Sequence, residues 1–209
     1  MKSAFGLAIP ETIEELVQEN VALLVWDMQH AIADRVFNRE EVIANIQLLL
    51  KAAHTRGVPV IYSQHYSIPF EAEDVSWIRT WWKRSGLDSP SELQPLAIPG
   101  SFAWEILAEV APVAGDVVLP KTRPSLFVGT PARDMLSGRG IKTLLITGVT
   151  TERGVLTTTN HAQLLGLIPV IVSDAVGSYT EPSHQKGLAA LSEVADLTTT
   201  TDIASIWSK

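Results

Sequence analysis

The chain has 209 residues, of which 46% are hydrophobic and 19% are charged. This length suits one α/β domain with a full core, and the composition argues against disorder. The net charge of −7, with scattered Lys and Arg, provides no basic patch, so a nucleic-acid partner is not expected. The complete absence of cysteine excludes disulfides, thiolate metal ligands and thiol catalysis.

The N-terminal stretch MKSAFGLAIPE is too short and too soon interrupted by charge to be a signal peptide. No apolar run approaches the roughly 20 residues of a membrane span. We therefore expect a cytoplasmic protein with no membrane partner, and a small-molecule substrate as its main ligand.

Apolar runs alternate with helical patterns along the chain. The run VALLVW at 21–26 predicts a strand buried on both faces. Asn38, with Glu41 three residues on, resembles a capping box and predicts the start of a helix that Gly57 closes. The later predicted elements are a strand at 58–63, a short helix at 101–110, a strand at 117–119, a helix between Thr130 and Gly140, a strand at 143–147, a helix at 152–165, a strand at 169–173, a helix at 181–194, a strand at 197–200 and a last helical turn.

Residues 66–100 interrupt this alternation. They contain Trp77, Trp81 and Trp82 between two Pro-bearing stretches, so we expect an insertion with one short helix inside a single domain spanning 1–209. Three Trp residues so close in sequence are compatible with a lid over a site, with plain packing or with a subunit contact.

Strands that alternate with helices imply right-handed crossovers and a parallel sheet covered on both faces. The predicted fold is a three-layer α/β/α sandwich with a mostly parallel, six-stranded, Rossmann-like sheet. Ligands gather outside the carboxyl ends of such strands. Asp27, Gln64 with His65, Lys121 and the turn 148–155 all follow predicted strands, and we expect them to meet at that edge.

Several familiar motifs are missing. The chain has neither GxxxxGK[ST] nor GxGxxG, which removes the usual nucleotide signatures, and no GxSxG elbow. The five His residues are far apart and lack HExxH spacing, so we expect no metal and no cofactor.

Three motifs carry a family resemblance. They are LLVWDMQ with Asp27, VLPKTRPSLFVGT with Lys121, and the turn in LLITGVTTERGVLTTTNHAQLLGLIPVIVSDAVGS. Together they resemble the isochorismatase-like hydrolase superfamily, also called the cysteine hydrolases, over nearly the whole chain. In most members the turn is similar to GVxTDxCV, and its Cys is a nucleophile that the Asp activates. Here Gly154 stands at the Cys position, so the acyl-enzyme route has no nucleophile.

The resemblance also implies a route without a thiol. The isochorismatases proper carry Gly at this position and cleave a vinyl ether without a covalent enzyme intermediate, although their turn resembles GVYAHxG rather than the GVTTERG of this chain. By this analogy Asp27 would be the general acid/base and Lys121 would orient Asp27 or hold the substrate. Gly154 would leave room where a thiol would stand, and its N–H would hold a substrate oxygen.

The same comparison implies further features. They are a non-proline cis peptide near Val149 and Thr150, and a homo-oligomer, either a dimer or a tetramer. The substrate-binding residues that we expect are Thr150, Arg153, His65, Gln64 and Trp82.

We therefore expect a hydrolase that acts on a small, anionic substrate of the vinyl ether type. Two alternatives stay open. One is a C–N (amide) hydrolase that works by direct attack of water. The other is a catalytically silent small-molecule-binding homologue of the cysteine amidases, or a variant of one in which Cys was replaced by Gly.

Overall fold

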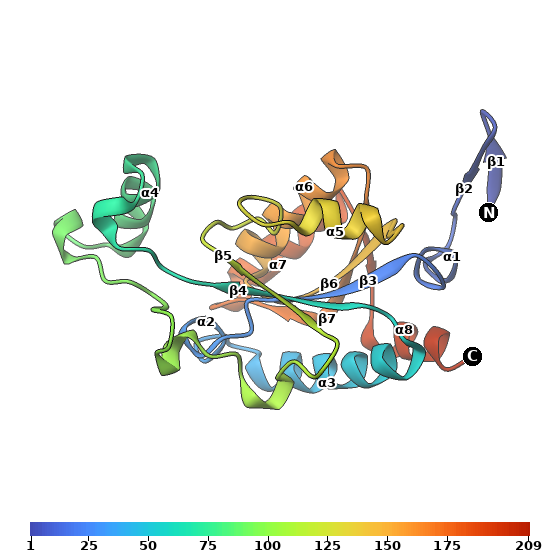
Figure 1. Cartoon of the computed structure of the whole chain (residues 1–209), viewed down its shortest axis with the longest axis horizontal. Helices are drawn as coiled ribbons and strands as arrows, with labels where there is room; N and C mark the ends of the chain where they lie inside the picture. The colour runs from blue at the N-terminus through green and yellow to red at the C-terminus, as the bar shows by residue number, and fades with distance from the viewer.

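A sheet of six parallel strands runs through the middle of the molecule, in the order β5-β4-β3-β6-β7-β8 (Figure 1). The computed structural model describes residues 1–209. The strands of the sheet are β3 (Val21–Trp26), β4 (Val60–His65), β5 (Val117–Lys121), β6 (Thr143–Val149), β7 (Ile168–Gly177) and β8 (Asp196–Thr198). The helices are α1 (Ile13–Val17), α2 (His30–Ala33), α3 (Arg39–Arg56), α4 (Val75–Ser85), α5 (Ala132–Gly138), α6 (Leu156–Leu164), α7 (Glu181–Ser192) and α8 (Thr200–Trp207).

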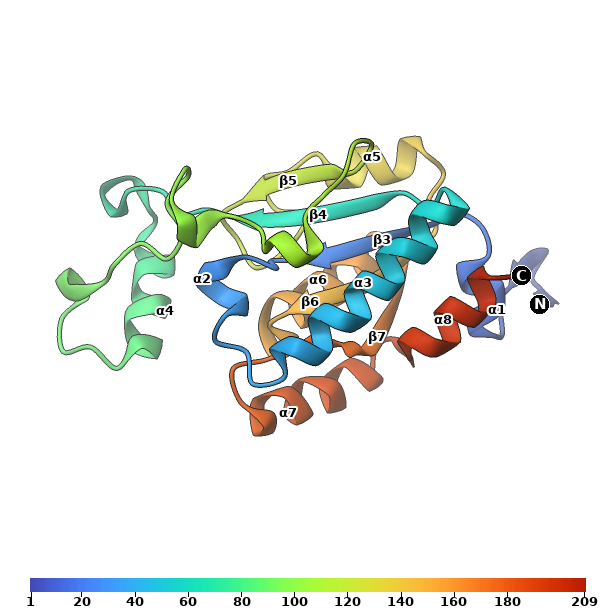
Figure 2. The same ribbon diagram turned by 90° about the horizontal axis from the view of Figure 1, so that it is seen from below.

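Helices cover both faces of the sheet, and the alternation of side chains along β3 shows how. Leu23 and Val25 pack with α2, α3 and α8 on one face. Ala22, Leu24 and Trp26 pack with α5, α6 and α7 on the other. Because successive side chains of a strand point to opposite faces, a continuous apolar run is what a strand between two helical layers requires. Figure 2 shows α3 lying along its face of the sheet. The three-layer α/β/α sandwich is thus confirmed.

The segment 101–110 differs from the prediction. Instead of one helix it forms two short 3₁₀ turns, Phe102–Trp104 and Ala108–Val110. Between them, Gln29 forms a β-bridge with Ile106, and the Leu107 N–H donates to the Met28 carbonyl at 2.9 Å. Pairing with the chain just after Asp27 therefore outweighs local helix propensity here.

The capping prediction at Asn38 is also wrong in its detail. Helix α3 does begin after Asn38, but the Asn38 side chain makes no cap and its Nδ2 donates to the Val176 carbonyl at 3.2 Å. The end of the helix is as expected, because Gly57 adopts the left-handed conformation with φ of 74°.

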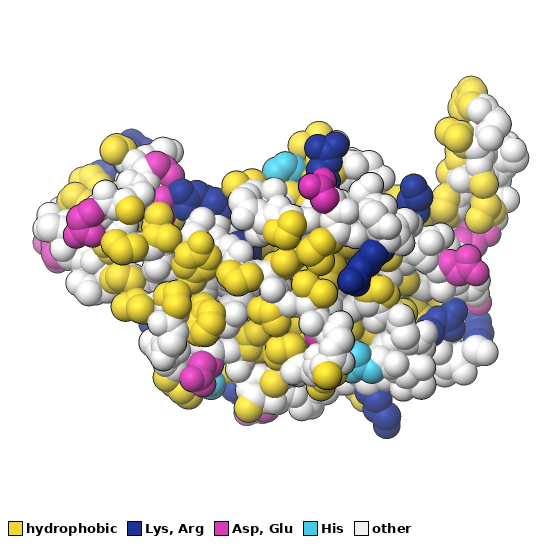
Figure 3. All heavy atoms as spheres, viewed as in Figure 1, with side chains coloured by type: hydrophobic (Ala, Val, Ile, Leu, Met, Phe, Trp, Pro, Cys, Tyr) yellow, Lys and Arg dark blue, Asp and Glu magenta, His cyan; other side chains and the backbone are white.

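Two parts project from the sandwich. The segment that carries α4 extends beyond the carboxyl ends of β3 and β4, and the N-terminal hairpin of β1 (Lys2–Ala4) and β2 (Leu7–Ile9) extends at the opposite end (Figure 1). Figure 3 shows apolar side chains spread over the face that carries α4 and β5. None of the helices has the length and apolar character needed to cross a bilayer.

Candidate active site

A cavity of about 260 Å³ opens at the carboxyl ends of the central strands, and side chains of α4 form part of its lining. Its lining includes Asp27 after β3, His65 at the end of β4, Lys121 at the end of β5, and the turn that follows β6. This is the edge at which ligands bind in open parallel sheets. The topology therefore brings together four chain segments that are far apart in sequence.

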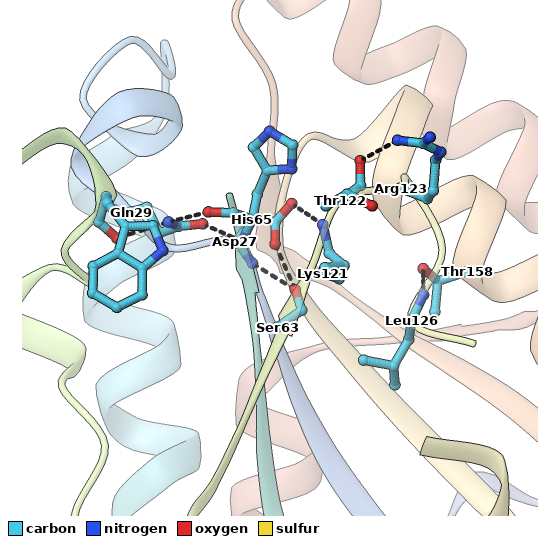
Figure 4. A network of polar contacts seen from close by, with 10 residues as sticks. Asp27, Gln29, Ser63, His65, Lys121, Thr122, Arg123, Leu126 and Thr158 are labelled. Atoms are coloured by element: carbon cyan, nitrogen blue, oxygen red, sulfur yellow. Dashed lines mark hydrogen bonds and ion pairs between the residues drawn. The ribbon is translucent and has the colours of Figure 1, made fainter. Parts of the chain in front are cut away.

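Asp27 lies on the floor of this cavity and is 6% exposed. Its backbone is left-handed, with φ of 47°, so the chain turns sharply as it leaves β3. Asp tolerates this region better than most residues, and such outliers gather at functional sites. The Ser63 hydroxyl donates to Asp27 Oδ1 at 2.6 Å and accepts from the Asp27 N–H at 3.1 Å. Ser63 thereby fixes both the backbone and the carboxylate of Asp27 (Figure 4).

Lys121 holds the other carboxylate oxygen. Its Nζ donates to Asp27 Oδ2 at 2.7 Å, and the Lys121 side chain is only 2% exposed. The same Nζ lies 4.1 Å from the centroid of the Trp26 ring, which is a cation–π contact. Burial lowers the pKa of the Lys121 ammonium, and the charge of Asp27 and its hydrogen bond partly offset that effect.

The place of a side chain at residue 154 is filled by Trp26. A Cβ built on Gly154 would lie 2.0 Å from Trp26 Nε1 and 2.4 Å from Cε2. Real non-bonded atoms do not approach so closely, and Trp26 is 1% exposed and packed in the core. The expectation that Gly154 leaves open room is therefore corrected, because an indole ring occupies that space.

His65 forms part of the wall beside Asp27 and is 8% exposed. Burial, together with the charge of Lys121, lowers the pKa of His65 to about 4, so its ring is neutral at pH 7. Gln29 fixes the backbone of His65 from both sides. Its Nε2 donates to the His65 carbonyl at 2.9 Å, and its Oε1 accepts from the His65 N–H at 2.6 Å (Figure 4).

The turn after β6 begins with a cis peptide between Val149 and Thr150, as expected. Residues Thr151–Val155 form a π-helical turn that runs into α6. Within it, Glu152 accepts a hydrogen bond from the Ser178 hydroxyl at 2.6 Å. Thr151 Oγ1 donates to the Gly177 carbonyl at 2.9 Å. These contacts tie the turn to the end of β7, so its cavity-facing groups have a fixed position.

Helix α4 supplies the outer wall of the cavity, with Trp77, Thr80, Trp81 and Arg84. Its start is tied to the loop after Lys121, because Arg123 binds Glu73 and Asp74 with Nη2–oxygen distances of 2.5 and 2.7 Å. Arg84 has no carboxylate partner in the chain, and Arg153 only approaches Glu152 at 3.7 Å. Two guanidinium groups are therefore available to a ligand.

The cavity collects most, but not all, of the residues predicted from the sequence. Asp27, Lys121, Gly154, Thr150, Arg153 and His65 line it. Gln64 and Trp82 do not, since Gln64 Nε2 donates to the Trp104 carbonyl at 3.1 Å and Trp82 Nε1 donates to the Leu87 carbonyl at 2.8 Å. No three or more His, Asp and Glu side chains lie together in a group that could hold a metal ion.

Sequence reasoning missed several residues of the site, among them Trp26, Ser63, Arg84 and Tyr179. Ser63 and Trp26 lie inside predicted strands, where the sequence pattern indicates packing within the sheet and no functional role. Arg84 lies in α4, whose placement follows from tertiary contacts alone. For Tyr179 the only available signal was its position two residues after the end of β7, at the sheet edge where ligands bind.

The sequence model of the isochorismatase domain matches residues 21–202, which is most of the chain. The chain belongs to the isochorismatase family. A ureidoacrylate amidohydrolase, RutB, of Enterobacter sp. (strain 638) is 31% identical over 205 residues, covering 86% of this chain and 81% of the relative. The chain is therefore a hydrolase of the isochorismatase family.

Solved structures of other members share the fold. A cysteine hydrolase from Pseudomonas syringae pv. phaseolicola 1448A superposes with a TM-score of 0.78 at 21% identity, covering 90% of this chain and 92% of that one. An isochorismatase family protein from Burkholderia thailandensis has a TM-score of 0.73 at 24% identity, covering 97% and 100%. At these identities the likeness concerns the fold, whose six-stranded parallel sheet is the scaffold of the site described above.

Proposed function

We propose that this isochorismatase-family protein hydrolyses a small anionic substrate with water, rather than a side chain, as the nucleophile. The observation that carries the proposal is the buried Asp27 carboxylate, held by Ser63 at 2.6 Å and Lys121 at 2.7 Å beside a residue 154 that has no side chain. A carboxylate with this support is suited to move a proton to or from a reacting group.

Cleavage of a C–N bond is the reaction that the geometry supports best. Both oxygens of Asp27 accept hydrogen bonds, which is the arrangement of a carboxylate ready to act as a base. In this scheme Asp27 takes a proton from water, the water oxygen attacks the substrate carbonyl, and the tetrahedral intermediate forms. The C–N bond then breaks, and the leaving nitrogen takes the proton back from Asp27. Similarity to an amidohydrolase supports this route.

Hydrolysis of a vinyl ether is the second candidate. Gly154 at the Cys position favours it, as does the aromatic wall of Trp77, Trp81 and Tyr179, which suits a flat, unsaturated ligand. Here Asp27 would act first as an acid and protonate the vinyl carbon. Water would then add to the oxocarbenium ion, and the resulting hemiketal would release an alcohol and a ketone.

The cations at the cavity support an anionic substrate. Lys121 and Arg123 are engaged with carboxylates of the chain, whereas Arg84 and Arg153 are available. A guanidinium group binds a carboxylate in bidentate geometry, so these two residues are the ones that we expect to hold the charged end of the substrate.

A substrate panel tests the proposal. Ureidoacrylate, other small carboxylate-bearing amides and carboxylate-bearing vinyl ethers are incubated with the parent protein and with Asp27→Asn. We expect turnover of one class by the parent and its loss in the variant, with Asp34→Asn, an exposed aspartate outside the cavity, as the matched control. Activity that rises with pH points to the base role of C–N cleavage, and activity that rises as pH falls points to vinyl ether protonation.

Two further measurements test the proposal. Mass spectrometry of the protein during turnover should show no acyl adduct, and an adduct would contradict direct attack by water. If no compound is turned over but carboxylates raise the melting temperature of the parent and of Asp27→Asn alike, the protein is a binding homologue and the proposal is wrong.

A further inference from the structure

The indole of Trp26 is the group that stands where the family places its nucleophile. Its Nε1 is the atom that a Cβ on Gly154 would meet first, at 2.0 Å. Trp26 is otherwise buried among the residues that cover the α6 face of the sheet, and it is 1% exposed. The small exposed part of the Trp26 side chain faces the cavity, which Trp26 helps to line.

The accessible part includes the indole nitrogen. The Nε1–H of Trp26 donates to no group in the protein, yet it is not one of the fully buried polar atoms without a partner, which are Asn38 Oδ1, Tyr62 OH and Trp104 Nε1. Trp Nε1–H is a donor only and costs free energy when it is unpaired, so a water or a ligand oxygen in the cavity would be stabilised by accepting from it.

Lys121 links the ring to Asp27. Lys121 Nζ contacts both groups, at 2.7 Å from Asp27 Oδ2 and 4.1 Å from the Trp26 ring centroid. The indole and the carboxylate therefore flank one ammonium on the cavity floor. A water between them can donate one hydrogen to Asp27 and accept from Nε1–H, which leaves its second lone pair free to attack.

We propose that the Trp26 Nε1–H holds the attacking water against Asp27. The assignment rests on the proposed hydrolysis by water and deepens it. In this arrangement no side chain attacks the substrate, and the Trp26 indole positions the molecule that does. When Asp27 takes the proton, the hydroxide equivalent forms within hydrogen-bond reach of a donor, which stabilises its developing charge.

Replacing the nitrogen alone is the sharpest test. A variant with 3-benzothienylalanine at residue 26 keeps the size of the ring but carries sulfur where the indole has N–H. In crystal structures we expect an ordered water about 3 Å from both Nε1 and the Asp27 carboxylate in the parent, and no water at that point in the variant. A parent without this water, or a variant that retains it, overturns the inference.

Kinetics provide an independent readout with whichever substrate the panel identifies. Trp26→Phe should lower kcat roughly 10- to 100-fold while KM stays within about 2-fold, because one hydrogen bond to the attacking water is lost. The matched control is Trp104→Phe, which removes an unpaired indole N–H outside the cavity and should leave kcat unchanged. Full kcat in Trp26→Phe would refute the role of Trp26 and leave the proposed hydrolysis standing. An inert parent would instead refute the hydrolysis, and the crystallographic test of the water would still decide the inference.

Discussion

Lys121 Nζ and Asp27 Oδ2 lie 2.7 Å apart, although 94 positions separate the two residues in sequence. Both side chains are almost completely buried. A buried ion pair requires both members, since removing one leaves an uncompensated charge in a medium of low polarity. The pair therefore couples the stability of the sheet edge to the chemistry of the cavity.

A double-mutant cycle tests this coupling. Lys121→Met should lower the free energy of unfolding by about 3–5 kcal/mol, because the Asp27 carboxylate stays buried with only Ser63 as partner. Asp27→Asn with Lys121→Met should cost clearly less than the sum of the two single changes. Urea unfolding measures all four proteins, with Lys142→Met as the surface control. Additivity within about 0.5 kcal/mol would show that the pair is not coupled.

Gly154→Ala tests the contact with Trp26. The added methyl group would overlap Nε1 and Cε2 of the indole, so we expect destabilisation of about 1–3 kcal/mol by thermal or urea unfolding. The overlap should be relieved when Trp26→Leu is combined with it. Gly138→Ala is the matched control, since a Cβ there meets nothing within 4 Å. Equal stability of Gly154→Ala and the parent would disprove the close contact.

His65 predicts a specific loss of stability in acid. Its folded-state pKa is about 4, below the ordinary 6.5, because burial disfavours the charged ring. Between these values the unfolded chain binds the proton and the folded chain does not, so the stability from this group is present above pH 6.5 and declines as pH falls toward 4. The decline from pH 7 to pH 5 should be about 2 kcal/mol. Between pH 7 and pH 5, the free energy of unfolding of His65→Phe should fall by about 2 kcal/mol less than that of the parent. An equal fall in both proteins would contradict the lowered pKa of His65.

Arg84 and Arg153 should determine affinity for carboxylates. Arg84→Gln and Arg153→Gln should each weaken binding of the substrate, or of a competing dicarboxylate, by roughly 10-fold, because each removes one charge-assisted contact. Isothermal titration measures this, and the effect should shrink at high salt. Arg139→Gln, which lies outside the cavity, is the control. Unchanged affinity in both cavity variants would mean that the anion binds elsewhere.

The oligomeric state is the remaining prediction. Val75 of α4 is 81% exposed, and Ile98 and Phe102, which follow it in the chain, are 54% and 67% exposed. We expect these side chains to be covered when two or more copies associate. Light scattering should give a multiple of the mass of one chain, and Phe102→Ser with Val75→Ser should shift it toward one chain. A single-chain mass for the parent would contradict the expected homo-oligomer.

Continuous burial is what made much of the fold predictable. VALLVW is apolar at every position, and the structure places a strand at those residues because β3 lies between two helical layers. The polar residues Ser173 and Asp174 mark the predicted end of the next-to-last strand. In the structure β7 continues to Gly177, and Asp174 Oδ1 accepts from the N–H and hydroxyl of Thr200 instead. The predicted strand therefore ended too early, because Asp174 is polar. In the structure its hydrogen-bond partner comes from α8.

Site residues that directly follow a strand could be predicted from the sequence. Residues whose orientation depends on tertiary packing could not. Asp27 and Lys121 were found because strand ends of a parallel sheet converge. Trp82 and Trp81 are neighbours with similar sequence signals, yet Trp81 faces the cavity and Trp82 donates to Leu87. Only the orientation of α4 distinguishes them, and that orientation depends on contacts such as Arg123 with Glu73.

The fit of Trp26 against Gly154 also constrains how the chain can change over generations. A lone mutation of Gly154 to Cys would place atoms inside an indole ring, and a lone loss of the ring would leave a hollow with no thiol beside it. Each single change should therefore cost stability, so the residues at positions 26 and 154 are expected to change together rather than one at a time.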